Sequence, residues 1–392
     1  MELGRVRAVY GDSLETEGPS CRIGDLLKIS SKGRTVCSVV SSFEANTVMS
    51  KLLDSAHGIG LGDVVYPTGG PPTIATGNSV LGRFLDPLGR PCDSKGELDD
   101  TRLETVALEL GATLEVGEKA VREQFVTGIR AIDALVPVAG GQQLLFVAGR
   151  GVGAETTFGM LARNSKADVV VAALIGTDRR GAAYYTDDMQ EALPKTVTVH
   201  APCHAPPAQQ RLCLKTAATL ANWFSNQGKS VLLLVNSLSS WLSAGGDADR
   251  ELSPMLSRLG GRVTGFYRLS QPHEVKPAPE LSSLFDGRIV LSSEMAQRMV
   301  YPAIDPLLSC ATEEFPSEGL DSYRYWARDI LARYHKNEDF IKIGAVLPGF
   351  NPLLDRSIEY YPELQSFLRQ GVKEKSELGT TLERLKGLLP FV

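Results

Sequence analysis

The sequence lacks the long apolar runs that membrane insertion requires. No stretch reaches the roughly 18 apolar residues that span a bilayer, and the N-terminal segment MELGRVRAVYGDSLE has no apolar signal core. We therefore expect neither a transmembrane segment nor secretory targeting. An excess of basic residues is also missing, because 46 Asp and Glu outweigh 41 Lys and Arg and leave a net charge of −5. This balance gives no reason to expect nucleic-acid binding.

Cysteine is scarce and scattered. The six cysteines lie at positions 21, 37, 92, 203, 213 and 310, without a C-x-x-C pair. This spacing is typical of reduced thiols in a cytosolic protein. His200, Cys203 and His204 lie close together, but the neighbouring prolines and the missing fourth ligand favour a plain loop. We predict no metal site there.

Short apolar runs of period two fill the first 70 residues. They are separated by Gly, Ser and Pro, and they read RVRAVYG, DLLKISS, TVCSVVSSF and DVVYPTGG. Alternation with frequent turn residues predicts a small antiparallel β-barrel or sandwich. A Gly-, Pro- and Asp-rich connector, GRFLDPLGRPCDSKGELD, begins at Gly82. We place the N-terminal barrel and its connector at residues 1–82.

Strand-like and helix-like segments alternate in the central region. Runs of nearly pure Val, Ala, Leu and Ile at 143–149, 168–176 and 231–237 predict buried strands, and QQRLCLKTAATLANWFSNQG predicts an amphipathic helix. Such alternation is typical of a parallel sheet covered by helices on both faces. We assign this α/β core to residues 83–316. Two later runs, 322–344 and 363–389, show apolar residues at spacings of three and four, which predicts a C-terminal helical domain over 317–392.

Seven segments follow one another along the chain: SVLGRFLDPLGRPCDSKG, TGIRAIDALVPVAGGQQLLFVAGRGVG, ARNSKADVVVAALIG, NQGKSVLLLVNSL, DGRIVLSSEMAQRMVYPAID, IKIGAVLPGFNPLLDRSIE and LQSFLRQGVKEKSELGTTLERLKGLL. In this order they resemble one family, the export ATPases of flagellar and type III secretion systems. The resemblance extends from about Gly4 to Leu389. The family is related to the alpha and beta subunits of rotary ATP synthases.

This resemblance implies a fold, an assembly and partners. The expected protomer has a β-barrel, a RecA-like P-loop core and a C-terminal helical domain, and it joins a six-membered ring. The implied location is cytoplasmic, peripheral at the inner-membrane export apparatus. The implied partners are stalk and stator proteins, an active paralogous ATPase or further copies of the same chain, but no nucleic acid.

The phosphate loop implied by the resemblance covers residues 148–157. Such a loop needs glycines whose N–H groups face phosphate, a lysine, and a hydroxyl for Mg²⁺. The glycines are present, but Ala154 stands at the lysine position and Glu155 at the hydroxyl position. A carboxylate facing a phosphate at 4 Å costs about 4 kcal/mol at an effective dielectric constant of 20. Glu155 has two alternative roles, binding Mg²⁺ or pairing with Arg150, and neither replaces the lysine.

Three further positions depart from the family pattern. Thr177 stands where the family has the glutamate that polarises the attacking water, and Asp178 is one residue away, which points its side chain elsewhere. Asn236 replaces the aspartate that orients Mg²⁺ through water. Thr312 stands where the family has the arginine that completes a neighbouring subunit's site. The resemblance therefore implies no intact catalytic residue.

The same residues also allow plainer interpretations. The loop glycines can form a strand-to-helix turn without a ligand, or an anion can bind at the helix N-terminus. In the second case the contacts for weak nucleotide or anion binding are Gly149, Arg150, Gly151, Val152, Gly153 and Thr156. Arg179 and Arg180 are alternatively solvated surface residues. We expect Trp223, Trp241 and Trp326 to be packing residues.

We interpret the chain as a pseudo-ATPase that serves as a ring or assembly subunit of a protein export apparatus. No cofactor is then expected. The alternative is a working Mg-ATP hydrolase with a rearranged site, in which Glu155 or Asp178 handles metal or water. A third hypothesis is a ring-shaped nucleic-acid translocase, against which the acidic balance argues. The sequence does not distinguish a flagellar from a virulence-type system.

Overall fold

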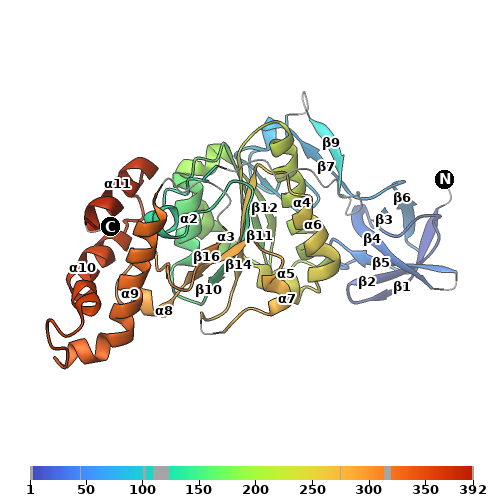
Figure 1. Ribbon diagram of the computed structural model, residues 1–392. Coiled ribbons are helices and arrows are strands. Elements are labelled where there is room, and N and C mark those ends of the chain that lie inside the picture. Colours follow the sequence, from blue (N-terminus) through green and yellow to red (C-terminus); the bar gives the residue numbers. More distant parts are fainter. Residues whose placement is uncertain are drawn as a thin grey trace.

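Three parts follow one another along the molecule. The computed structural model describes residues 3–44, 46–99, 103–108, 123–273, 275–312 and 319–390. Figure 1 shows the N-terminal barrel at one end, the α/β core in the middle and the C-terminal helices at the other end. This order confirms the fold class predicted from the sequence.

The N-terminal part is a closed six-stranded barrel with the strand order β1-β2-β5-β4-β3-β6. Its strands are β1 (Gly4–Tyr10), β2 (Ser13–Glu17), β3 (Leu26–Ser31), β4 (Arg34–Glu44), β5 (Thr47–Leu52) and β6 (Val64–Pro67). Alternate residues point inwards, as in Ile29 of β3 and Val65 of β6, which are fully buried. The period-two runs of the sequence therefore line the barrel interior.

The connector leads into the core through short strands. β7 (Thr73–Thr76) pairs with β9 (Glu104–Ala107), and the 3-10 turn η1 (Asn78–Val80) follows β7. β8 (Phe84–Leu85) lies parallel to β12 and forms an edge of the core sheet. The Gly- and Pro-rich connector thus contributes a strand that its composition did not indicate.

The core is an eight-stranded sheet with the order β16-β15-β10-β14-β13-β11-β12-β8. Its strands after β8 are β10 (Gln143–Ala148), β11 (Val169–Ile175), β12 (Thr196–Ala201), β13 (Val231–Val235), β14 (Val263–Leu269), β15 (Gly287–Leu291) and β16 (Cys310–Ala311). All pairings are parallel except that of β15 with β16. The carboxyl ends of the parallel strands therefore meet at one edge, where ligands of such sheets bind.

Helices cover both faces of this sheet. The core helices are α1 (Arg130–Leu135), α2 (Ala154–Asn164), α3 (Arg179–Asp188), α4 (Pro207–Asn226), α5 (Leu238–Ser243), α6 (Ser253–Ser257), α7 (Pro279–Ser282) and α8 (Ser293–Gln297), with short turns at η3 (Gln190–Lys195) and η4 (Ala248–Leu252). Alternate residues of β10 divide between the faces: Phe146 packs with the α2 side and Val147 with the α4 side. Strands buried on both faces explain the continuous apolar runs.

The C-terminal part consists of α9 (Asp321–Lys342), α10 (Pro352–Leu368) and α11 (Leu378–Leu388). The helical run expected over 363–389 is divided between α10 and α11. Helix α10 ends because the backbone of Arg369 is extended. The buried side chain of Gln370 then contacts the core: its Oε1 accepts from Arg130 N–H at 2.9 Å, and its Nε2 donates to Gly128 O at 2.8 Å. Within the part of the chain that the structure describes, no helix has the length and apolar character to cross a membrane.

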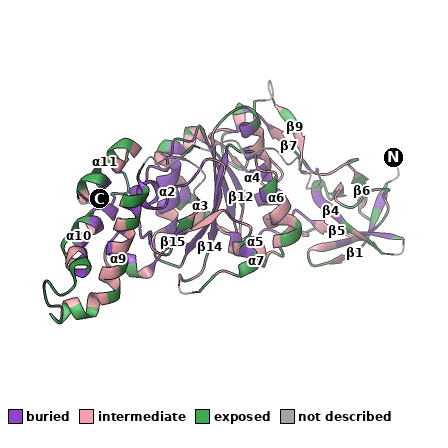
Figure 2. Cartoon of the chain, in the orientation of Figure 1, coloured by how far each residue is buried: buried purple, intermediate pink, exposed green. Residues whose placement is uncertain are grey.

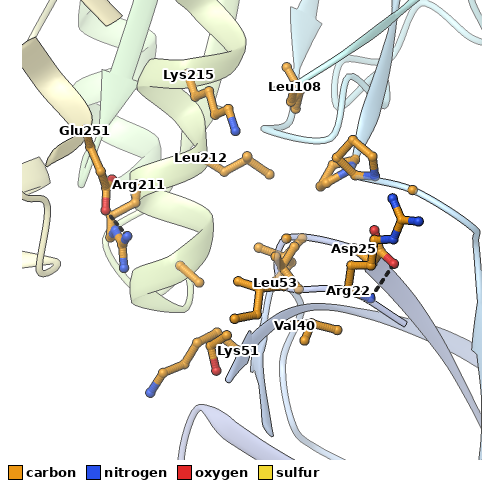
Figure 3. A pocket seen from close by; sticks show the side chains of 18 of the residues that line it. Arg22, Asp25, Val40, Lys51, Leu53, Leu108, Arg211, Leu212, Lys215 and Glu251 are labelled. Carbon is orange, nitrogen blue, oxygen red and sulfur yellow. Dashed lines mark hydrogen bonds and ion pairs between the residues drawn. The ribbon is translucent and has the colours of Figure 1, made fainter. Parts of the chain in front are cut away.

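A cleft of about 1170 Å³ separates the barrel from α4. Figure 3 shows Lys51 and Asp25 on the barrel side, with Lys215 and Arg211 on the helix side. Arg211 pairs with Glu251 across the cleft wall. None of the lining residues belongs to the phosphate loop, so this cleft is separate from the site predicted from the sequence.

Candidate nucleotide site

The predicted phosphate loop joins β10 to α2 at the carboxyl edge of the sheet. Gly151 and Gly153 adopt φ values of +78° and +84°, and Gly153 is the N-cap residue of α2. A Cβ atom on either glycine would meet no heavy atom within 4 Å. The glycines are therefore required by the left-handed backbone and not by crowding. The strand, turn and helix predicted from the sequence are present.

Ala154, at the implied lysine position, contributes a methyl group to the core. It is 1% exposed and packs in the same cluster as Val152 and Phe158. The loop therefore keeps the fold of a phosphate cradle but presents no ammonium group from this position.

Glu155 forms an ion pair with Arg268 of β14 and not with Arg150, for which no ion pair occurs among the described residues. The side chain of Arg268 is 10% exposed and that of Glu155 is 39% exposed. Sequence reasoning missed Arg268. The available signal was a cation inside VTGFYRL, a strand buried along its whole length, because charged residues are almost never buried unless paired.

Two side chains of α3 border this ion pair. Burial raises the pKa of Tyr185, the charge of Arg268 opposes that increase, and Glu155 adds to it. Burial also raises the pKa of Asp188, which Arg163 opposes. The ion pair thus lies in a partly desolvated pocket between β14, α2 and α3, where charges interact more strongly than in water.

Thr177 and Asn236 are in direct contact. Asn236 Nδ2 donates to Thr177 Oγ1 at 2.6 Å, and Asn236 Oδ1 accepts from Ile175 N–H at 2.6 Å. Asn236 is buried, so these bonds satisfy its amide without water. Two positions that the resemblance marks for carboxylates therefore hold a neutral pair that ties the end of β11 to β13.

Asp178 is the N-cap of α3 and accepts from Gly181 N–H at 2.7 Å. Its carboxylate is thereby directed at a helix terminus, where it stabilises the free N–H groups. In this geometry the Asp178 carboxylate serves as a helix cap. The rearranged hydrolase would need this carboxylate elsewhere.

Thr312 lies at the opposite edge of the sheet from the phosphate loop. The preceding residue, Ala311, pairs with Gly287, the first residue of β15, and Thr312 Oγ1 donates to Asp286 O at 2.8 Å. Thr312 is therefore remote from the loop of its own chain. Thr312 supplies no charged group at this position.

The other predicted arginines face solvent, and the predicted histidine contacts a backbone carbonyl group. Arg150, Arg179 and Arg180 are exposed. His200 Nε2 lies 3.0 Å from the carbonyl oxygen of Thr177. In the described ranges, no group of three or more His, Cys, Asp or Glu side chains is arranged to hold a metal ion.

Comparison with known proteins shows which family the chain belongs to. The model of the ATP synthase alpha/beta family, nucleotide-binding domain, matches residues 128–274, and that of the T3SS EscN ATPase C-terminal domain matches 323–387. The flagellum-specific ATP synthase of Treponema pallidum is 33% identical over 419 residues, which cover 98% of this chain and 93% of the relative. The chain belongs to the flagellar and type III secretion ATPase family.

Other members extend the similarity to structure. The type 3 secretion system ATPase of Pseudomonas savastanoi pv. phaseolicola is 31% identical, with 99% of this chain and 94% of the relative covered. The assembled ATPase EscN of enteropathogenic E. coli, in complex with its central stalk EscO, matches with a TM-score of 0.90 and 27% identity over 98% of this chain and 100% of that chain. The similarity therefore includes the barrel and the C-terminal helices of this export ATPase relative.

Proposed function

We propose that this member of the export ATPase family is a pseudo-ATPase that acts as a ring or assembly subunit of a protein export apparatus. The observation that carries the proposal is the hydrogen bond between Asn236 and Thr177. In place of two carboxylates for Mg²⁺ and water, the site contains a satisfied neutral pair. A buried polar group with all its bonds made has little affinity left for a hydrated metal ion.

The phosphate loop supports the same proposal. Ala154 supplies no cation, and Glu155 directs a negative charge to the loop while paired with Arg268. The alternative, a rearranged hydrolase, needs Glu155 or Asp178 for metal or water. Both carboxylates are already engaged, one in the ion pair and one in capping α3. This engagement favours the assembly role.

The C-terminal helices offer a surface for the assembly role. We define the hairpin tip as five exposed apolar residues around the α9–α10 turn: Phe340, Ile343, Leu347, Phe350 and Leu353. Figure 2 shows this turn as an exposed end of the molecule. Since EscN is found with a central stalk protein, we propose that the hairpin tip contacts the corresponding stalk, with the chain cytoplasmic and peripheral at the inner membrane. Stator proteins and an active paralogue are further proposed partners.

The test is titration of the purified chain with ATP and Mg²⁺ by calorimetry, together with an assay of phosphate release. We expect no binding heat and no turnover. The variant Ala154→Lys/Glu155→Thr restores the cation and hydroxyl and is expected to gain ATP binding. Mg²⁺-dependent turnover by the natural chain would overturn the proposed function in favour of the hydrolase.

A further inference from the structure

The ion pair beneath the phosphate loop is asymmetric. Arg268 extends from β14, which lies between β10 and β13 in the sheet, and its side chain is 10% exposed. Glu155 is on the first turn of α2 and is 39% exposed. The arginine is therefore fixed in place and permanently charged, whereas the glutamate can turn outwards. If the Glu155 carboxylate moves away, Arg268 is left as a buried charge without a counter-ion. Another anion could then bind to Arg268.

Glu155 does not exhaust the donors of this site. Arg268 Nε is buried and has no acceptor among the residues that the structure describes. The N-terminus of α2 also has no side-chain cap, so its first N–H groups remain available for an anion. Arg268 contacts the carboxylate of Glu155, a residue of this same first turn. Arg268 Nε and the first N–H groups of α2 therefore keep donor capacity that Glu155 does not use.

We propose that Glu155 is an internal plug, whose carboxylate neutralises Arg268 and thereby closes an anion site formed by Arg268 and the N-terminus of α2. The ligand class of the unplugged site is a phosphate-like oxyanion, bound without Mg²⁺ and without a loop lysine. This inference rests on the proposed function, because it takes the natural chain to be free of nucleotide. The plug also replaces the stabilisation that a bound ligand would give to the folded loop.

The probe is inorganic pyrophosphate in magnesium-free buffer, and the variant is Glu155→Gln. Losing the carboxylate leaves Arg268 buried without a counter-ion, so the melting temperature is expected to fall by several degrees. Millimolar pyrophosphate is expected to restore it, while sodium chloride at equal ionic strength does not. Calorimetry is expected to show pyrophosphate binding to the variant at least tenfold tighter than to the natural chain.

The matched control is Arg268→Gln, alone and combined with Glu155→Gln. In the single control Glu155 turns to solvent, so the melting temperature falls less than in Glu155→Gln. Neither control is expected to respond to pyrophosphate. An absent response in Glu155→Gln, an equal response in the natural chain or a response that survives loss of Arg268 would each overturn the plug.

A second variant keeps the test decisive if Glu155→Gln does not fold. Glu155→Asp shortens the side chain and withdraws the carboxylate from Arg268. Pyrophosphate is therefore expected to raise the melting temperature of this variant. An Asp variant that folds but shows no such increase would count against the plug. The two proposals fail separately. Turnover of ATP by the natural chain contradicts the assembly role, whereas a silent Glu155→Gln variant contradicts the plug alone.

Discussion

Asn236, the neutral residue at the position where the family has an aspartate, is held by hydrogen bonds to protein groups. Asn236 has the shape of an aspartate, yet it donates to Thr177 and accepts from Ile175 N–H. A carboxylate at 236 cannot donate to Thr177, so the Thr177 hydroxyl would have to rotate and donate instead. The carboxylate must also be desolvated. The surroundings of position 236 therefore suit the amide of Asn236 better than a carboxylate, so Asn236→Asp alone is not expected to restore Mg²⁺ binding.

We predict that Asn236→Asp lowers the free energy of unfolding by about 1–3 kcal/mol at neutral pH. Burial raises the pKa of the new carboxyl in the folded state, so the loss shrinks as the pH falls and the group becomes protonated. Urea denaturation at neutral and acidic pH measures both effects. Thr177→Val, which removes only one hydroxyl, is the control for the shared hydrogen bond; an Asp variant as stable as the natural chain at neutral pH would contradict the argument.

For single residues, the sequence shows which positions depart from the family pattern but not which side chains these positions contact. Ala154, Glu155 and Thr177 could be read along the chain against the family pattern. Arg268 could not be connected with Glu155, because 113 residues separate them and only the pairing of β14 beside β10 brings them together. The pairing is a property of the sheet and not of either local segment.

Among the elements, the break between α10 and α11 has a clear structural role. Arg130 of α1 donates through Nε to Phe367 O at 3.0 Å, donates to Arg369 O, and pairs with Glu374. Burial favours the neutral form of Glu374, but the bonds from Arg130 and Gly371 N–H hold the pKa of its carboxyl below the ordinary value. The buried arginine thus fastens the C-terminal helices to the core.

Arg130→Gln is expected to loosen this attachment by about 2–4 kcal/mol, since three contacts of one buried side chain are lost. Hydrogen–deuterium exchange should become faster in α10 and α11 and remain unchanged in β11. Glu374→Gln is the matched control and should cost about 1 kcal/mol or less, because Glu374 is half-exposed and the carbonyl contacts persist. Equal effects of the two variants would contradict the role of Arg130.

Glu374 also gives the attachment a pH dependence. Because its pKa is lower in the folded than in the unfolded state, its contribution is present above the unfolded pKa and is lost as the pH falls through the folded pKa. The acid-induced loosening of α10 and α11 should be weaker in Glu374→Gln than in the natural chain.

On the scale of the whole molecule, the surface of the C-terminal end differs from that of the core. Ile343 and Phe350 are 75% and 88% exposed at the hairpin tip, although apolar side chains of this size normally lie inside. A cluster of such residues is typical of an interaction surface. Their removal should therefore affect binding and not folding.

We predict that Ile343→Ser/Phe350→Ser leaves the melting temperature within about 2 °C of the natural value. Binding to the proposed stalk protein should weaken at least tenfold, measured by biolayer interferometry. The control is Ile23→Ser/Leu61→Ser, which removes two exposed apolar residues from the barrel at the other end of the molecule. Equal weakening by both variants, or none by the tip variant, would contradict the proposed stalk contact.

The sequence by itself determined the class of fold, and it carries the departures from the family pattern at the expected catalytic positions. Period-two runs predicted the barrel and continuous apolar runs predicted the core strands, because both patterns follow from which faces of a strand are buried. The family resemblance was likewise contained in the order of segments from Gly4 to Leu389. These signals are local, so they can be read without knowing what lies beside them.

Only the tertiary structure decided which hydrogen-bond and ion-pair partners the altered residues have. The contacts of Glu155 with Arg268, of Asn236 with Thr177 and of Arg130 with Arg369 each join segments that are remote in sequence. Such contacts depend on strand order and helix docking, which bring distant side chains within a few ångströms of each other. The partners of the altered positions are therefore a consequence of packing, whereas the departure of these positions from the family pattern is evident from the residues alone.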